Sequence, residues 1–214
     1  MAIIGYSSIC TNKTNKAIMA RYPKWRWMLS TRSPLGFKTM KQSYDLSAGY
    51  AVDNGAYSDF LHGRPFRTKR FLKLLELFGK DADWVVIPDV VLSKSLTLDA
   101  AREWVPRLPY RKLFVVQDGM RERDIRPFAD DIQGVFIGGS TEWKLSTLPY
   151  WCDWASESEK ISHVGRVNTM RRLQLSVDHK ATSFDGSATA RFREEARRMT
   201  GYMMDLNRQI PLFR

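Results

Sequence analysis

The chain has 214 residues, of which 43% are hydrophobic, and this predicts one compact domain over residues 1–214 with a full core. Its formal net charge of +11 favours a polyanionic partner such as nucleic acid, although a basic protein that is merely soluble is the alternative. The two cysteines, Cys10 and Cys152, exclude a disulfide framework and a CxxC zinc site. The chain opens without a basic leader and holds no apolar run near the ~20 residues of a membrane span. We therefore expect a soluble, cytoplasmic protein with no membrane partner.

Short apolar or β-branched runs along the chain predict strands. Two runs stand near the N-terminus, at 2–6 and 25–29, and the polar segments 11–16 and 30–43 that follow them are expected to be loops. From residue 48 onward such runs recur at 49–52, 84–87, 113–116, 134–137, 161–164 and 181–184.

Amphipathic segments lie between or after these later runs. Their apolar positions recur at helical spacing: Phe71, Leu74, Leu75 and Phe78; Leu98, Ala101, Val105 and Leu108; Met170, Leu173 and Val177; and Ala188, Phe192, Ala196, Met199 and Met203. Pro106 should end or kink the second helix, and Asn168 can cap the third. Eight strands in this alternation predict an α/β fold, a compact (β/α)₈ barrel of the TIM type, with a doubly wound open sheet as the alternative.

Polar or backbone-exposing residues follow the later strands at their carboxyl ends. In a parallel barrel these ends share one rim, where active sites form. The residues are Asp53, Asp89, Gln117, Gly138 with Gly139, His163 with Gly165, and Asp185. A single acid at a strand end commonly caps a helix or turn, but a series of such residues favours a site.

Asp53 and Asp185 can face each other across the barrel mouth. Two carboxylates with separate roles are the minimum for displacement at an anomeric carbon through a covalent intermediate. Asp89, Gln117 and the Gly138–Gly139 backbone would remain to bind a planar heterocycle. The three histidines lack metal-ligand spacing, and neither GxxxxGK[ST] nor GxSxG occurs, so we expect no metal, no nucleotide cofactor and no serine nucleophile.

Five segments in order resemble those of the tRNA-guanine transglycosylases and their DNA-directed relatives, the DpdA-type phage and bacterial enzymes that put 7-deazaguanines into DNA. "DNGAYSDF" looks like the family's "DSGGFQ", "IPDVV" like its base-binding aspartate segment, "VVQDG" like "VQGG", "IGGSTEWK" like "GGLAVGE", and "ATSFDGSATARF" like "VDMFDCVLPTR". The matches run from about residue 50 to 192, roughly two thirds of the chain.

The resemblance implies a role for each matching residue. Asp185 would be the nucleophile and Asp53 the general acid/base. The base would be held by Asp89, Gln117, Gly138, Gly139 and Ser140. "HVGRVNTMRRL" also looks DpdA-like and would bring His163 and Arg166 near the bound nucleotide. No cofactor is implied, and a 7-deazaguanine base such as 7-cyano-7-deazaguanine would be the co-substrate.

One departure from the family bears on the substrate. The tRNA enzymes carry a zinc site of three cysteines and a histidine after the nucleophile, and this chain has neither those cysteines nor the length after Asp185 for it. The resemblance therefore favours DNA as the partner, with RNA as the alternative, and a location in the host cytoplasm if the chain is phage-encoded.

Arginines that follow the strand ends are candidates for binding the polyanion. Arg121, Arg166 and Arg191 are the best placed among a larger basic set that also includes Arg64, Arg67, Lys69, Arg70, Arg123, Arg171, Arg172 and Arg193. Trp143 and Tyr57 could stack on a base or pack in the core. Three other functions stay open: exchange on RNA, a catalytically silent nucleic-acid-binding barrel, and a glycosidase that hydrolyses the bond and stops.

Overall fold

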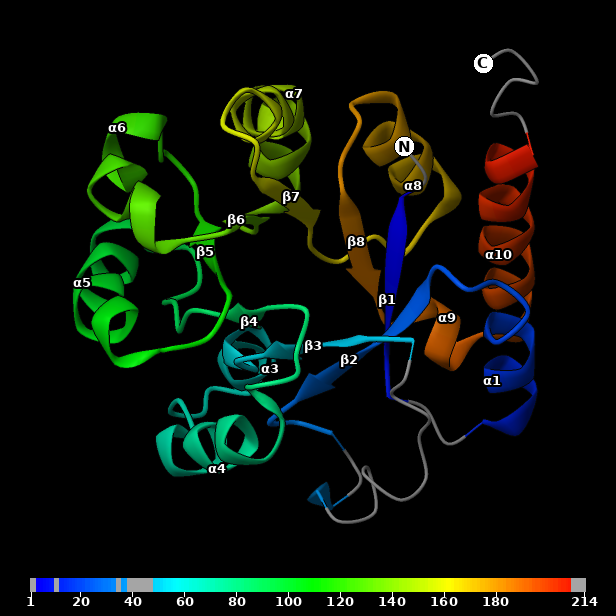
Figure 1. The fold of residues 1–214 in the computed structure, drawn as a ribbon, viewed down its shortest axis with the longest axis horizontal. Coiled ribbons are helices and arrows are strands. Elements are labelled where there is room, and N and C mark those ends of the chain that lie inside the picture. The colour runs from blue at the N-terminus through cyan, green and yellow to red at the C-terminus, as the bar shows by residue number, and fades with distance from the viewer. Residues whose placement is uncertain (1–2, 10–11, 34–35, 38–47, 209–214) are drawn as a thin grey trace.

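The computed structural model describes residues 3–9, 12–33, 36–37 and 48–208, and these residues form a closed barrel of eight parallel strands (Figure 1). The strands pair in chain order, and β8 pairs with β1 to close the barrel. Their bounds are β1 Ile4–Ser8, β2 Trp25–Ser30, β3 Tyr50–Asp53, β4 Val85–Val86, β5 Lys112–Val116, β6 Gly134–Ile137, β7 Ile161–Val164 and β8 Ser183–Gly186. The predicted (β/α)₈ barrel is confirmed, and the doubly wound sheet is wrong.

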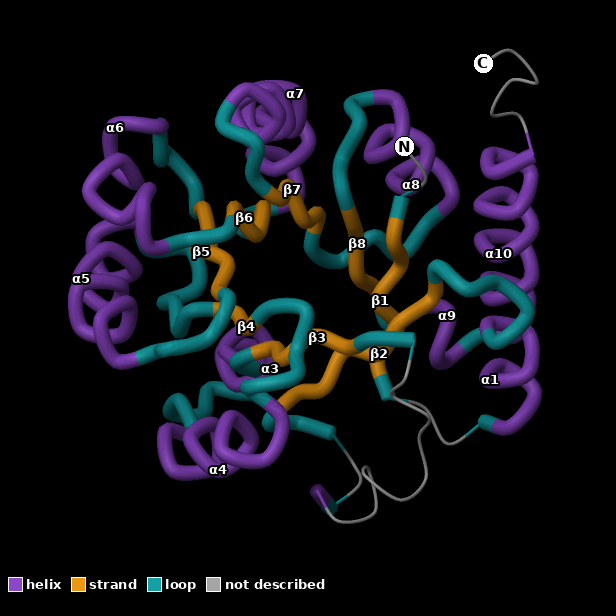
Figure 2. Tube along the Cα trace, in the orientation of Figure 1, coloured by secondary structure: helices purple, strands orange, loops and turns teal. Residues whose placement is uncertain are grey.

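Helices surround the barrel on the outside (Figure 2). Their bounds are α1 Lys13–Met19, α3 Ala56–Leu61, α4 Thr68–Phe78, α5 Lys94–Trp104, α6 Glu122–Ile125, α7 Thr141–Glu157, α8 Met170–Asp178, α9 Ala188–Arg191 and α10 Arg193–Arg208, with 3₁₀ turns at Val105–Arg107 and Arg126–Asp131. The last helix, α10, packs beside α1, so the first and last described helices lie together on one side of the barrel (Figure 1). No helix among the described residues is long and apolar enough to cross a membrane.

The segment 11–16 was expected to be a loop, but the structure places most of it in α1. Asn12 caps this helix, because its side-chain oxygen accepts the backbone N–H of Asn15 at 3.1 Å. Asn15 is itself buried and donates to the carbonyl oxygen of Thr189 at 2.9 Å. A polar composition concealed the helix because its inward face is held by side-chain hydrogen bonds. Most of the expected loop 30–43 lies outside the described residues.

Two expected helices differ in detail from the structure. Asn168 does not cap α8; Thr169 does, and the Asn168 side chain instead accepts the backbone N–H groups of Ser187 and Ala188 at 2.8 and 3.1 Å. The helix expected from Ala188 onward is broken at Phe192, which has an extended backbone between α9 and α10. Pro106, as predicted, ends α5, because it lies in the 3₁₀ turn that follows.

Two apolar layers hold the barrel together. The larger lies between the strands and the helices, where alternate strand residues such as Val85, Val116 and Val135 are fully buried. The smaller fills the barrel interior, where Tyr6 and Trp84 pack at a ring-centroid separation of 5.0 Å. This interior packing makes the barrel a solid core rather than a channel. The open space is left at the carboxyl ends of the strands.

Candidate active site

A cavity of about 570 Å³ lies at the carboxyl ends of the strands. Ten of the candidate site residues from the sequence line it: Asp53, Tyr57, Asp89, Gln117, Gly138, Gly139, Arg166, Arg172, Asp185 and Arg191. They come from β3, β8 and the segments that follow β3, β4, β5, β6, β7 and β8. Strands far apart in the sequence therefore deliver these residues to one concave site.

Asp53 is the last residue of β3, and its carboxyl group accepts a hydrogen bond from the Ser30 hydroxyl at 3.1 Å. The pKa of Asp53 is raised to about 7, first by burial and then by the nearby negative charge of Asp185. The Ser30 hydrogen bond works against this rise. A carboxyl group with this pKa can give up or take up a proton near neutral pH.

Asp185 stands on β8 with its side chain 19% exposed to the cavity side. Its Oδ1 atom accepts the backbone N–H of Arg166 at 3.2 Å and lies 3.1 Å from Nε2 of His163. Within the described part of the chain, no hydrogen bond reaches Oδ2. One carboxylate oxygen is thus anchored, and the other is left for a ligand.

His163 lies beneath Asp185 and is completely buried. Its ring packs among Tyr6, Trp84 and Phe136, with ring-centroid separations of 5.7, 4.7 and 4.7 Å. Burial lowers the pKa of His163, which favours the neutral ring. Nδ1 lies 2.9 Å from the Ser183 hydroxyl, so a neutral ring that accepts from Ser183 donates its Nε2–H to Asp185.

This placement corrects the expectation that His163 binds substrate. The imidazole does not line the cavity, because its strand position points it into the barrel core. What it contacts is the carboxylate that does line the cavity. His163 is therefore placed to orient Asp185.

Asp89 is held from two sides by side-chain amides. Asn54 donates to Oδ1 at 2.8 Å, and Gln117 donates to Oδ2 at 2.6 Å. Burial raises the pKa of Asp89 to about 6, while the two amide hydrogen bonds oppose the rise. Asn54 was missed in the sequence, although it directly follows Asp53 at a strand end. Its side chain also accepts the backbone N–H of Ala56 at 2.7 Å, which ties the Asp53 loop to Asp89.

In the segment after β6, the two glycines line the cavity, and the next residue caps helix α7. Gly139 lines the cavity with φ +69, a backbone conformation that favours glycine. Ser140, expected to bind the base, does not line the cavity, because it caps α7 and donates to Asp118 Oδ1 at 2.5 Å. Trp143 packs against the core rather than at the site.

Arginines form one side of the cavity. Arg166, Arg172 and Arg191 line it from the β7 and β8 side. Arg166 has φ +60, donates from its guanidinium to the carbonyl oxygen of Gly139, and lies with its Cζ 4.2 Å from the ring centre of Tyr57. Arg121 does not join them; it is exposed and lies near the ring of Tyr150. The expectation that Arg121 binds the same ligand at this cavity is not supported.

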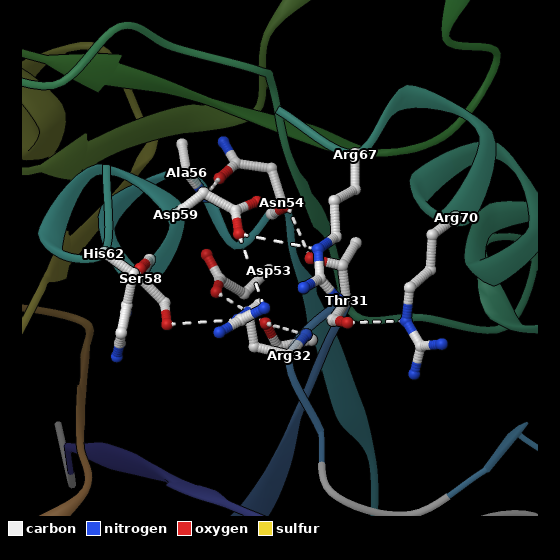
Figure 3. Close-up of polar contacts among 11 residues, drawn as sticks. Thr31, Arg32, Asp53, Asn54, Ala56, Ser58, Asp59, His62, Arg67 and Arg70 are labelled. Atoms are coloured by element: carbon white, nitrogen blue, oxygen red, sulfur yellow. Dashed lines mark hydrogen bonds and ion pairs between the residues drawn. The ribbon is translucent and has the colours of Figure 1, made fainter. Parts of the chain in front are cut away.

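Arg32 also lines the cavity and lies near Asp53 (Figure 3). It was missed in the sequence, although it follows the carboxyl end of β2 by two residues. Its guanidinium donates to the Ser58 hydroxyl at 3.3 Å and lies 3.6 Å from Oδ1 of Asp59, a carboxylate only 2% exposed that Arg67 approaches at the same distance (Figure 3). This buried carboxylate holds Arg32 at the rim.

Lys144 is a further buried cation near the site that the sequence did not reveal. It is 1% exposed and donates from Nζ to the carbonyl oxygen of Gly165, the residue before Arg166. The pKa of Lys144 is lowered to about 7, first by burial and then by the positive charge of Arg166. The lysine therefore fixes the turn whose next N–H binds Asp185.

The residues that the structure describes contain no group of three or more His, Cys, Asp or Glu side chains able to hold a metal ion. A comparison of the sequence with protein-family models finds no match, and a comparison with curated proteins finds none either.

Proposed function

We propose that the barrel exchanges a guanine of DNA for a 7-deazaguanine base through a covalent intermediate between Asp185 and the sugar. The observation that carries the proposal is the pair of carboxyl groups in one cavity: Asp185 is anchored through one oxygen, and Asp53 has a pKa of about 7. Two carboxyl groups, one as nucleophile and one as general acid and base, are what a double displacement at an anomeric carbon requires.

In the first half of the reaction, Oδ2 of Asp185 attacks C1′ of the nucleotide. The bond from C1′ to N9 breaks, its electron pair leaves with guanine, and Asp53 supplies the proton that makes the departing base neutral. Asp185 then forms an ester with the sugar. Because Asp185 has lost its negative charge at this point, the repulsion that raises the pKa of Asp53 disappears, and proton release from Asp53 becomes easier.

In the second half, the incoming 7-deazaguanine occupies the pocket that guanine has left. Its N9–H proton passes to the carboxylate of Asp53, and N9 attacks C1′ while the ester bond to Asp185 breaks. Two displacements at the same carbon leave the configuration unchanged. No cofactor takes part in either half.

Asp89 is the candidate for selecting guanine-like bases. A carboxylate has about four acceptor positions, and the amides of Asn54 and Gln117 use only one on each oxygen. The remaining positions suit the N1–H and exocyclic amine of guanine, which adenine does not present together. The backbone of Gly138 and Gly139 lies on the same cavity and can approach the base closely.

Arg166, Arg172 and Arg191 supply positive charge for the phosphates beside the target nucleotide. A base inside a duplex cannot reach a concave site, so the nucleotide is flipped out or presented as single strand. The choice of DNA over RNA rests on the resemblance of these segments to the DNA-directed enzymes.

The test is incubation of the purified protein with DNA and 7-cyano-7-deazaguanine, followed by digestion and mass spectrometry of the nucleosides. The expected result is the modified deoxynucleoside with the wild-type protein and none with Asp185→Ala. A parallel reaction on tRNA separates RNA exchange from DNA exchange. Release of free guanine without incorporation would show a glycosidase, and unchanged nucleosides together with DNA binding would show a silent barrel.

A further inference from the structure

Phe192 is exposed in the structure, although the sequence pattern predicted that it is buried. Its position in the apolar stripe predicted burial, but the break between α9 and α10 leaves it 54% exposed. Its backbone N–H still bonds to the carbonyl oxygen of Ala188 at 2.8 Å, so the break is held in place. An exposed aromatic ring on a fixed backbone beside a cavity suits a ligand with a flat face.

A second cavity of about 400 Å³ lies at this ring and adjoins the first. Three residues line both cavities, namely Asn168, Ser187 and Arg191, so the two cavities are neighbours on the β8 side of the barrel mouth. Arg191 stands between them, with its Cζ 5.4 Å from the ring centre of Phe192. The second cavity is large enough for one planar base.

The second cavity also has an acceptor without a partner. Glu195 lines it, and its Oε2 atom is buried with no hydrogen bond among the described residues, whereas Oε1 lies 3.4 Å from Arg198. A carboxylate oxygen there accepts N–H groups and repels phosphate. Together with the neighbouring Glu194, it favours an uncharged group that carries N–H donors.

We propose that the second cavity binds the nucleobase next to the exchanged guanine. The base stacks on Phe192, an N–H donor of its edge bonds to the Glu195 carboxylate, and the phosphate between the two nucleotides lies at Arg191. Adenine and cytosine offer an exocyclic amine to the carboxylate. Thymine offers only an N3–H that lies between two carbonyl oxygens, so the site selects against thymine at this neighbouring position.

This inference rests on the proposed exchange and is tested with single-stranded oligonucleotides that hold one guanine. The base on its 5′ or 3′ side is adenine, cytosine or thymine, and exchange with 7-cyano-7-deazaguanine is measured. With wild-type protein, thymine on one of the two sides should raise the KM for the oligonucleotide about tenfold relative to cytosine. Glu195→Gln should remove most of this difference, because an amide can both donate and accept.

Phe192→Ala should raise the KM of every oligonucleotide about tenfold, since stacking on one base is lost, and should leave the KM of the free base unchanged. Phe192→Trp should behave like wild type. Leu96→Ala is the matched control, because Leu96 is equally exposed at 53% but stands on α5, away from both cavities.

The same oligonucleotides are titrated by fluorescence anisotropy, which needs no exchange. Weaker binding by Phe192→Ala and a thymine penalty that disappears in Glu195→Gln would support the second site even if no base is exchanged. Exchange by wild type with Phe192→Ala and Glu195→Gln both unchanged in KM and neighbour preference would overturn it and leave the proposed function standing.

Discussion

Nε2 of the buried His163 lies 3.1 Å from Oδ1 of Asp185, and Nδ1 of the same ring lies 2.9 Å from the Ser183 hydroxyl. The imidazole thus connects the barrel interior to the carboxylate that faces the cavity. His163→Phe should lower kcat for exchange about tenfold to a hundredfold with little change in the KM for DNA, because an aromatic ring fits among its neighbours but cannot donate to Asp185. His163→Gln, which keeps an N–H donor, should recover part of this loss.

The measurement for His163 is single-turnover formation of the covalent adduct between protein and DNA. A role in folding alone would change the amount of active protein and leave the rate of adduct formation per active site unaltered. Equal rates for wild type and His163→Phe would therefore contradict a positioning role.

The activity should depend on pH through two cavity carboxyl groups. Asp53 must be protonated to release guanine, and its pKa of about 7 predicts that kcat/KM for DNA falls above pH 7. Asp89 must be ionised to accept two N–H groups, and its pKa of about 6 predicts a fall below pH 6. The profile should be bell-shaped, with its maximum between these values.

Ser30→Ala is the variant that tests the alkaline side of this profile. The Ser30 hydroxyl stabilises the carboxylate of Asp53, so its removal should raise the pKa of Asp53 and move the fall in kcat/KM to higher pH. The acidic side, which belongs to Asp89, should stay in place. An alkaline limb that does not move would assign it to another group.

Lys144 should make the stability of the fold depend on pH. Its pKa is lowered to about 7 in the folded protein, so between pH 7 and its ordinary pKa the unfolded chain holds a proton that the folded chain lacks. Stability from this group therefore rises with pH in that range, with a slope of up to about 1.4 kcal/mol per pH unit. Lys144→Met should lack this rise.

The measurement for Lys144 is urea unfolding of both proteins at pH 6, 7.5 and 9. Between pH 7.5 and pH 9, the free energy of unfolding of the wild type should rise relative to that of Lys144→Met. A difference that stays constant with pH would mean that Lys144 is charged throughout the range.

The cavity arginines should be distinguishable from Arg121 by the salt dependence of DNA binding. Arg166→Gly keeps the backbone at φ +60 without strain and removes the whole side chain with its charge, and it should reduce the slope of log K against log salt by about 1. Arg191→Ala should do the same. Arg121→Ala, which lies outside the cavity, should leave affinity within about twofold of wild type. Equal losses for Arg121 and Arg166 would place the nucleic acid elsewhere.

Some elements of this protein could be predicted from local patterns and others could not. The runs 134–137 and 161–164 coincide with β6 and β7, because Val135, Phe136 and Ile137 in the first run, and Ile161 and Val164 in the second, mark short strands between polar segments. Helix α1 was missed because its first turns are polar, and the buried Asn15 is held by hydrogen bonds rather than by apolar packing. Helix α7 was not predicted, and Pro149 lies inside it.

The sequence by itself determined that the strands alternate with helices and that acids stand at several strand ends, because these patterns depend on neighbours close in the chain. It follows from parallel strands that Asp53, Asp89 and Asp185 reach the same rim. Which side chains then face the cavity was decided only by the tertiary structure. In the structure, Ser140 caps α7, the His163 ring is buried in the core, and the Phe192 ring is exposed to solvent. Side-chain direction and burial, and the pKa values that follow from burial, depend on packing between residues far apart in the sequence.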